Sequence, residues 1–287
     1  MAAAPSTELR LGLAAKAENL ALVRQALSGF ADGISIPEGP LADLKQIATE
    51  ACMNAVIHAY PGRDDGRIDV HAIASGGEVE IRIRDWGVGF RPRPAQTDGS
   101  LRLGLPLIAS VVNSFGIENP DGGGTTLFAR VRTHGDVDPV DREMPEAPKE
   151  AEVVVDAGVT AKPVIARVIA IAATRAGFSL DRMSDGVLVG DAIAAAQPDD
   201  FADGRVGIEI EECGPNLCLR VGPLQSGGAD RLLRQMELPG LGASVTKLVD
   251  SVEVIENESG EYLAIELSPD SAVPAGGAPA PQASSGT

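Results

Sequence analysis

The chain has 287 residues, enough for two domains of ordinary size, and 44% of them are hydrophobic, so it can bury cores and is not a disordered polymer. Its 24 basic and 41 acidic side chains give a net charge of −17, which argues against direct nucleic-acid binding. No apolar run approaches the roughly 20 residues that span a bilayer, and no secretory signal is visible. We therefore expect no membrane contact. With three cysteines and no Cys-x-x-Cys pair, we expect neither a disulfide framework nor a thiolate zinc site. The composition as a whole predicts a cytoplasmic location.

Hydrophobic periodicity predicts the secondary structure of the first half. In chain order, the expected elements are a strand over 9–13, helices over 17–30 and 40–55, strands over 67–74 and 78–84, a helix over 103–114 and a strand over 125–131. Ser75-Gly76-Gly77 between two of the strands is a hairpin signature. Helices mixed with a mainly antiparallel sheet predict an α/β fold, specifically a two-layer α/β sandwich.

Composition divides the chain into four parts. Residues 1–135 form the first predicted domain, 136–152 an acidic, proline-bearing linker, 153–268 a second domain, and 269–287 an Ala/Pro/Gly/Ser tail too poor in apolar residues to order itself. The two domains resemble each other at a constant offset of 137. This offset places Asn54 opposite Asp191, Asp85 opposite Gly222, and Ile117 opposite Val254. We interpret this as a tandem duplication with a degenerate C-terminal copy.

Glu50 and Asn54 lie four residues apart on the second predicted helix, so both project from one face. A carboxylate can act as a general base, and an amide oxygen is a hard ligand suited to Mg²⁺. Taken alone, such a pair is most often a solvated helix face.

Glycines and one aspartate mark three further positions. A predicted strand ends at Asp85, where a carboxylate can accept a hydrogen bond from an exocyclic amine, and Gly87 and Gly89 free the backbone that follows. Gly104 lies where a helix opens, and helix N-termini bind phosphate. Thr125 follows a run of glycines before the last strand.

Together these elements resemble the GHKL ATPases, which have the Bergerat ATP-binding fold, and within them the bacterial anti-sigma-factor serine kinases. The resemblance covers roughly residues 8–132, and residues 153–268 only as a degenerate copy. It implies ATP and Mg²⁺ as cofactors, Glu50 as the catalytic base and Asn54 as the Mg²⁺ ligand. It also implies that Asp85 binds the adenine amino group.

The same resemblance implies that Gly87 and Gly89 shape the adenine pocket, that Gly104 faces the phosphates, and that Thr125 lies near the adenine through solvent. Its implied partners are a sigma factor and an anti-anti-sigma protein of STAS type, whose serine would be phosphorylated. A duplicated chain would form a pseudo-dimer by itself, and homo-oligomerisation stays open.

Two departures from the family pattern leave alternatives open. The usual glycine pair before the phosphate helix is replaced by Leu101-Arg102. Arg102 either supplies charge to a phosphate or is a solvated residue of the ATP lid. The second copy has Val187 where Glu50 stands, so we read it as a pseudo-ATPase module. Its acidity suits either a basic partner or general solubility. The rival function for the whole chain is a nucleotide-binding switch that sequesters its partner without phosphoryl transfer.

Overall fold

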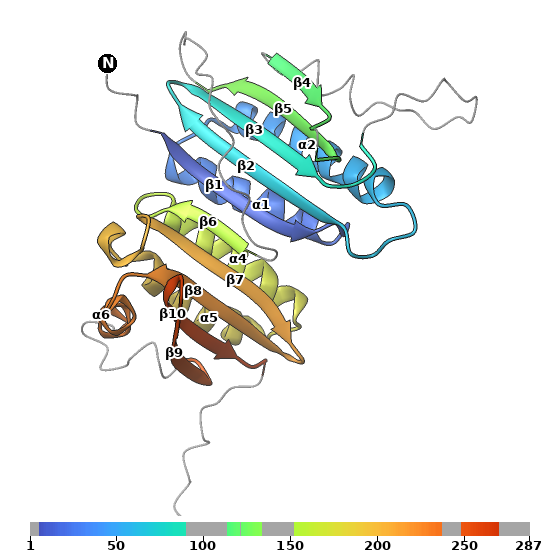
Figure 1. The fold of residues 1–287 in the computed structure, drawn as a ribbon. Helices are drawn as coiled ribbons and strands as arrows, with labels where there is room; N and C mark the ends of the chain where they lie inside the picture. The colour runs from blue at the N-terminus through green and yellow to red at the C-terminus, as the bar shows by residue number, and fades with distance from the viewer. Residues whose placement is uncertain (1–5, 90–113, 121, 134–151, 237–247, 270–287) are drawn as a thin grey trace, which may run out of the picture.

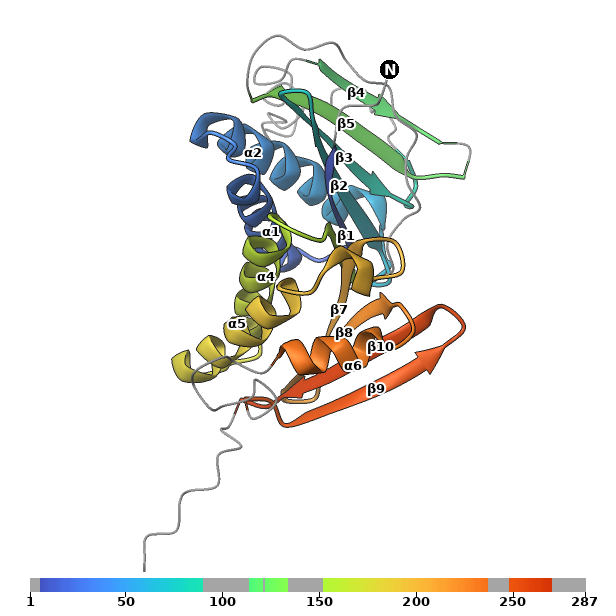
Figure 2. The same cartoon turned by 90° about the vertical axis from the view of Figure 1, so that its left-hand side faces the viewer.

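The computed structural model describes residues 6–89, 114–120, 122–133, 152–236 and 248–269. These ranges form one ten-stranded sheet with the strand order β4-β5-β3-β2-β1-β6-β7-β8-β10-β9, in which every neighbouring pair is antiparallel. Four helices, α1, α2, α4 and α5, form a second layer on one face of this sheet (Figures 1 and 2). The predicted two-layer α/β architecture is confirmed. No helix in these ranges is both long enough and apolar enough to cross a membrane.

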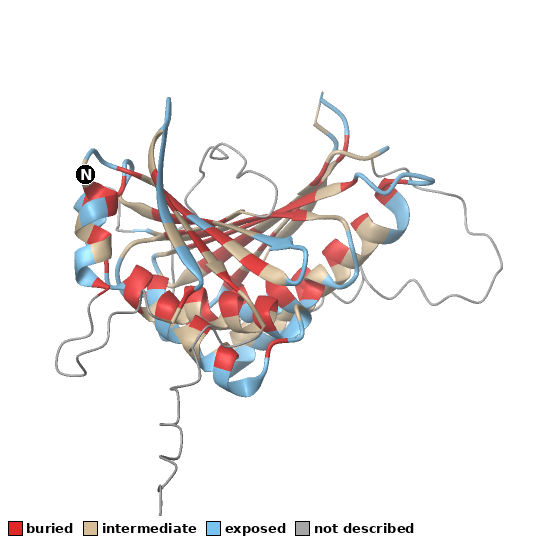
Figure 3. Cartoon of the chain, turned by 90° about the horizontal axis from the view of Figure 1, so that it is seen from below, coloured by how far each residue is buried: buried red, intermediate tan, exposed pale blue. Residues whose placement is uncertain are grey.

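The first half contributes five strands and two helices to this arrangement. They are β1 (Thr7–Ala14), α1 (Asn19–Gly33), α2 (Glu38–Asn54), β2 (Arg67–Ser75), β3 (Glu78–Asp85), β4 (Ser114–Glu118) and β5 (Thr125–Arg132). In α2, Leu44, Ile47, Ala48 and Ala51 recur at helical spacing and are all buried, which explains why this face packs against β3 and β5. Figure 3 shows the buried residues concentrated between the helices and the sheet.

The second half comprises β6 (Glu152–Asp156), α4 (Ala161–Arg175), α5 (Leu180–Ala194), β7 (Arg205–Cys213), β8 (Asn216–Leu224), the short helix α6 (Gly228–Gln235), β9 (Ser251–Asn257) and β10 (Gly260–Leu267). Apart from the short helix α6, its elements follow the same order as the described elements of the first half. Its strands also have the same order, counted outward from the centre of the sheet. A common origin of the two halves stays an interpretation. The domain limits likewise stay predictions, although β6 already begins at Glu152, the last residue assigned to the linker.

A seam between β1 and β6 joins the two halves, with Leu9 opposite Val155 and Leu11 opposite Val153. Beneath it, α1 packs on α4 so closely that a Cβ on Gly29 would lie 2.4 Å from the carbonyl oxygen of Pro163. Small residues here allow the two helices to approach.

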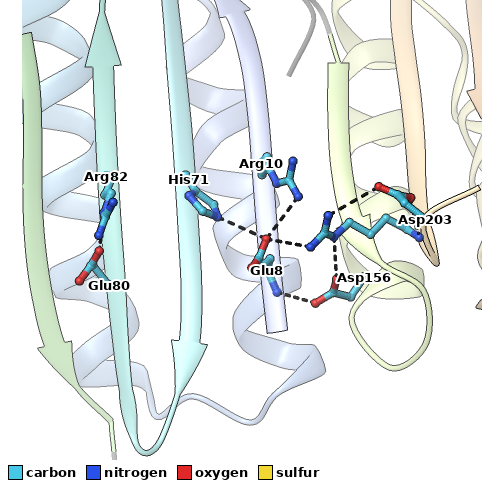
Figure 4. A network of polar contacts seen from close by, with 8 residues as sticks. Glu8, Arg10, His71, Glu80, Arg82, Asp156 and Asp203 are labelled. Atoms are coloured by element: carbon cyan, nitrogen blue, oxygen red, sulfur yellow. Dashed lines mark hydrogen bonds and ion pairs between the residues drawn. The ribbon is translucent and has the colours of Figure 1, made fainter. Parts of the chain in front are cut away.

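Charged side chains cross the same seam on the sheet (Figure 4). The Oε2 atom of Glu8 lies 3.3 Å from Nη2 of Arg205 in β7 and 3.6 Å from Nε2 of His71 in β2. Arg205 also bonds Asp156, which in turn accepts the backbone N–H of Glu8 at 2.7 Å. The close approach of His71, followed by the cations, lowers the pKa of Glu8 to about 2. The halves are therefore tied by an ionic cluster as well as by backbone hydrogen bonds.

The structure corrects three details of the sequence analysis. Helix α2 begins at Glu38, before Pro40, because a proline in the first turn loses only an N–H that has no intrahelical acceptor. Ser114 belongs to strand β4 instead of the predicted helix over 103–114, whose other residues lie outside the described ranges. Cys213 and Cys218 form a disulfide across the β7–β8 hairpin, so a single local bond exists where no disulfide framework was expected.

Candidate functional site

The candidate site lies in the first half, where the C-terminal end of α2 faces the ends of β3 and β5. Glu50 and Asn54 are half-buried and one helical turn apart at the end of α2. The helix continues directly after Asn54 as a π-helix, Ala55–Ala59. Single π-helical turns inside longer helices are frequent at functional sites because they re-aim the side chains on either side.

Asp85 ends β3 and is buried. Its Oδ1 accepts the backbone N–H of Gly87 at 2.9 Å, and the N–H and hydroxyl of Thr125 also hydrogen-bond to the carboxyl group. Burial nevertheless raises the pKa of Asp85 above its ordinary value, since desolvation outweighs these donors. A buried carboxylate with this residual cost would gain from a further donor.

Thr125 is the direct backbone partner of Asp85 in the β3–β5 ladder. In the structure Thr125 hydrogen-bonds the Asp85 carboxylate, and its predicted place near the adenine through solvent stays a prediction. Its described contacts therefore position another side chain of the site.

The glycines of the site serve close packing between chain segments. A Cβ on Gly87 would lie 2.1 Å from the carbonyl oxygen of Ala59 at the end of the π-helix. A Cβ on Gly124 would lie 1.9 Å from the carbonyl oxygen of Asp85, and Gly124 also has a positive φ of 80°. Gly89 has a φ of 77°, in the left-handed region that favours glycine. These glycines let α2, β3 and the turn before β5 meet around Asp85.

Tyr60, which the sequence analysis did not select, ties the helix to the strand end. Its hydroxyl accepts the backbone N–H of Trp86 at 2.8 Å and donates to the carbonyl oxygen of Arg67. The backbone N–H of Val88 bonds the carbonyl oxygen of Ala59 at 2.9 Å, which adds a second link. A tyrosine just after the Glu50–Asn54 helix was the available signal, but only the fold brings it to Trp86.

Trp86 lies against two arginines, with the guanidinium carbons of Arg84 and Arg67 at 4.9 and 5.4 Å from its ring. Such cation–π contacts hold an aromatic ring in place. Trp86 is therefore fixed by protein contacts next to Asp85.

Hydrogen bonds link Asp85 with Gly87 and Thr125, Gly89 lies close to Gly124, and Glu50 and Asn54 are on α2, which packs against β3 and β5. Arg102 and Gly104 lie outside the described residues, so their predicted roles stay predictions. Within the described ranges, no group of three or more His, Cys, Asp or Glu side chains is arranged to hold a metal. If Asn54 holds a Mg²⁺ ion, the other ligands do not come from such a group of side chains in the described ranges.

A cavity of about 510 Å³ lies elsewhere, at the seam between the halves. Its lining includes Leu13, Lys16, Arg175, Glu212 and Leu217, and none of the candidate site residues. Residues 90–113 lie outside the described ranges. We therefore separate this seam cavity from the candidate site.

The corresponding place in the second half is built differently. Both hairpins turn on two residues, with Ser75 paired to Glu78 and Cys213 paired to Asn216, which sets an offset of 138 between their strands. Asp85 thus corresponds to Pro223, and not to Gly222 as the offset of 137 predicted. The predicted match between Ile117 and Val254 agrees with their ladder partners, Leu127 and Leu263.

An internal carboxylate occupies the end of β8. Glu261, at the start of β10, accepts backbone N–H groups of Gly227 and Ala229 at the N-terminus of α6. These bonds lower the pKa of Glu261. Leu224, which pairs with Glu261, is fully buried, so next to Pro223, the position that corresponds to Asp85, the second half has an apolar side chain and a hydrogen-bonded acid.

Comparison with known proteins supports the assignment of the first half. Residues 13–131 match the family described as the histidine kinase-like ATPase domain. The chain is 32% identical over 83 residues to an anti-sigma F factor of Halalkalibacterium halodurans, covering 29% of this chain and 57% of that protein. It is 37% identical over 83 residues to the serine-protein kinase RsbW of Listeria monocytogenes, covering 29% of this chain and 53% of the relative.

Two further comparisons differ in coverage. An anti-sigma F factor of Geobacillus stearothermophilus is 24% identical over 134 residues, covering 43% of this chain and 90% of that factor. A crystal structure of the RsbU and RsbW domains of a Mycobacterium tuberculosis protein aligns with a TM-score of 0.36 and 26% identity, over 48% of this chain and 35% of that one. The chain spans about half the length of the first two curated relatives. The match of residues 13–131 to the histidine kinase-like ATPase domain agrees with the GHKL resemblance that the sequence predicted.

Proposed function

We propose that the chain is an ATP-dependent anti-sigma factor whose first half phosphorylates a serine of an anti-anti-sigma protein. The names of the relatives, anti-sigma F factor and serine-protein kinase RsbW, support this class of function. The observation that carries the proposal is the buried Asp85 carboxylate next to the Glu50–Asn54 helix. It combines an acceptor for a purine amine with a carboxylate and an amide one turn apart.

In this proposal each residue of the site has one task. Asp85 accepts a hydrogen bond from the adenine amino group, and Thr125 and the N–H of Gly87 orient its carboxylate. Asn54 would hold Mg²⁺, which neutralises phosphate charge when bound. Glu50 would take the proton of the attacking serine hydroxyl. The residues present fit ATP at the adenine end, since the buried Asp85 carboxylate is an acceptor of the kind that an exocyclic amine needs.

The decisive experiment compares the wild type with Glu50→Ala, using ATP, Mg²⁺ and purified candidate anti-anti-sigma proteins. Loss of a general base costs about 10²–10⁴-fold in rate. We expect antagonist phosphorylation to fall by that factor, while ATP binding and sigma-factor binding persist because Glu50 does not contact the adenine. Phosphate-affinity gels measure the rate, and calorimetry measures ATP binding.

Two outcomes would contradict the kinase proposal. If the wild type phosphorylates none of the candidates but still binds ATP, the chain is the nucleotide-binding switch of the rival hypothesis. If Glu50→Ala phosphorylates as fast as the wild type, the base has been assigned to the wrong residue.

A further inference from the structure

The β7–β8 hairpin carries two cysteines on its face directed away from the helices. Leu217 and Leu219 of β8 are buried toward the helix layer, so Cys218 between them points to the opposite side. Cys213 ends β7 and pairs with Asn216, which places it diagonally from Cys218. Their Cα atoms are 6.0 Å apart, within the range that a disulfide spans.

This disulfide adds little stability to a hairpin that is already held by backbone hydrogen bonds. It links residues separated by five positions, and the entropic effect of a cross-link is smallest for short loops. The backbone ladder runs past it on both sides, from Ile208–Val221 to Cys213–Asn216. Bond formation and reduction are therefore compatible with one fold.

The two thiols differ in access. Cys213 is exposed, whereas Cys218 is partly covered between the neighbouring strands. Cys52, the third cysteine, is buried in α2, and burial raises its pKa to about 12. Because the thiolate is the reactive form, Cys52 is inert in the folded protein and serves as an internal reference.

Acidic side chains surround the pair. Cys218 has Glu211 opposite it in β7 and Glu266 opposite it in β10. Glu212, opposite Leu217, lies on the helix side near Arg175, and the cation Arg220 is paired with Glu209 at 2.7 Å. The local field is negative, so it repels anionic reagents and attracts cationic ones.

We propose that Cys213 and Cys218 form a reversible thiol–disulfide modification site that reacts preferentially with neutral or cationic low-molecular-weight disulfides. The Cys213 thiolate attacks one sulfur of the small disulfide and releases one small thiol. The Cys218 thiolate then attacks the Cys213 sulfur and expels the second small thiol. The protein dithiol loses two electrons and two protons, and the small disulfide gains them. This site is independent of the proposed kinase function.

The test counts thiols in the intact chain by maleimide labelling and mass spectrometry. Reduced protein should label twice when native and three times in denaturant. After cystamine, it should label zero times when native and once in denaturant, and dithiothreitol should restore the first pattern. Retention of two reactive thiols after cystamine would overturn the proposal.

Two matched variants test the order of the steps and keep the proposal falsifiable. Cys218→Ser should accumulate one cysteamine adduct on Cys213, because the resolving thiol is missing, and Cys213→Ser should react more slowly. Cystamine, a dication, should oxidise the wild type about tenfold faster than the anionic glutathione disulfide at low salt, and added salt should narrow this ratio. Absence of the adduct in Cys218→Ser, or equal rates for the two disulfides at low salt, would contradict the mechanism.

Discussion

The ends of β3 and β8 occupy matching places in the two halves, but the pKa values of the acids beside them shift in opposite directions. At the end of β3, the Asp85 carboxylate is buried, and desolvation raises its pKa although Gly87 and Thr125 donate hydrogen bonds to it. At the end of β8, Leu224 is buried and the Glu261 carboxylate is satisfied by backbone N–H groups of α6, which lower its pKa. One strand end carries the buried acid that we propose as a ligand acceptor, and the other carries an acid bonded to backbone N–H groups of the chain itself. Similar strand order therefore does not imply similar binding capacity.

The largest effect is expected from Gly124→Ala. Its Cβ would lie 1.9 Å from the Asp85 carbonyl oxygen, and its φ of 80° is strained for alanine, so we expect a loss of about 2–4 kcal/mol in the free energy of unfolding. Gly62→Ala is the matched control, because Gly62 has a φ of 74° but no atom within 4 Å of the added Cβ. Urea denaturation should show the control losing only about 1 kcal/mol. Equal losses would mean that the close approach of β3 and the β5 turn is unimportant.

Asp85→Asn should separate binding from stability. Losing a hydrogen bond to a charged group should weaken ATP binding by about 1.5–3 kcal/mol, while folding stability is kept or rises because a desolvated charge is removed. Asp69→Asn, another buried acid whose pKa is raised by burial, should leave ATP affinity unchanged because its side chain alternates to the other sheet face. Calorimetry of the wild type should give one ATP per chain. Two sites per chain would contradict the contrast between the halves.

Glu8→Gln addresses the joint between the halves. The pKa of Glu8 is lowered to about 2, so its carboxylate stabilises the fold above about pH 4.5, and this stabilisation is lost as the pH falls toward 2. With allowance for partial solvent screening, we expect the variant to lose about 1–2 kcal/mol at pH 7. Urea denaturation at pH 7 and at pH 2.5 should show the difference shrinking at the acid end. A constant difference would mean that the charge of Glu8 does not matter.

The smallest effect concerns Glu261. Removing the carboxylate in Glu261→Ala leaves N–H groups at the start of α6 without their acceptor, which should cost about 1 kcal/mol. Since the pKa of Glu261 is lowered, the contribution is present above its ordinary pKa of 4.5 and fades as the pH falls below it. Glu261→Gln keeps one acceptor oxygen and should recover part of the loss in thermal unfolding. A full loss in Glu261→Gln would show that charge, and not hydrogen bonding, is what α6 requires.

Much of this architecture could be predicted from the sequence because the signals are local. Alternating strands around Gly76-Gly77 and the helical stripe through Ile47 and Ala51 gave elements within a few residues of their observed bounds. The candidate site residues Glu50, Asn54 and Asp85 could be selected because their types and order match a family pattern.

What escaped prediction depends on contacts between distant segments. Tyr60 acts through Trp86, 26 residues away, and Glu261 reaches α6 from a strand more than 30 residues later. The Cys213–Cys218 bond depends on strand register, which a short Gly-Pro turn fixes but a spacing rule for cysteines does not capture. The offset of 137 failed at Asp85 for a related reason, since the hairpin turns, and not sequence similarity, set the equivalent positions.

The seam between β1 and β6 also determines which strands form the edges of the described sheet. The first strand of each half pairs with the first strand of the other half. The described sheet therefore has two edge strands, β4 and β9, one from each half. These two edges differ, because β4 belongs to the half with the candidate ATP site and β9 to the half in which Leu224 and Glu261 lie at the matching strand end. A protein that docks on one edge therefore meets a unique surface, and one chain offers it one place in one orientation. Two halves with the same strand order thus form one chain whose two sheet edges differ.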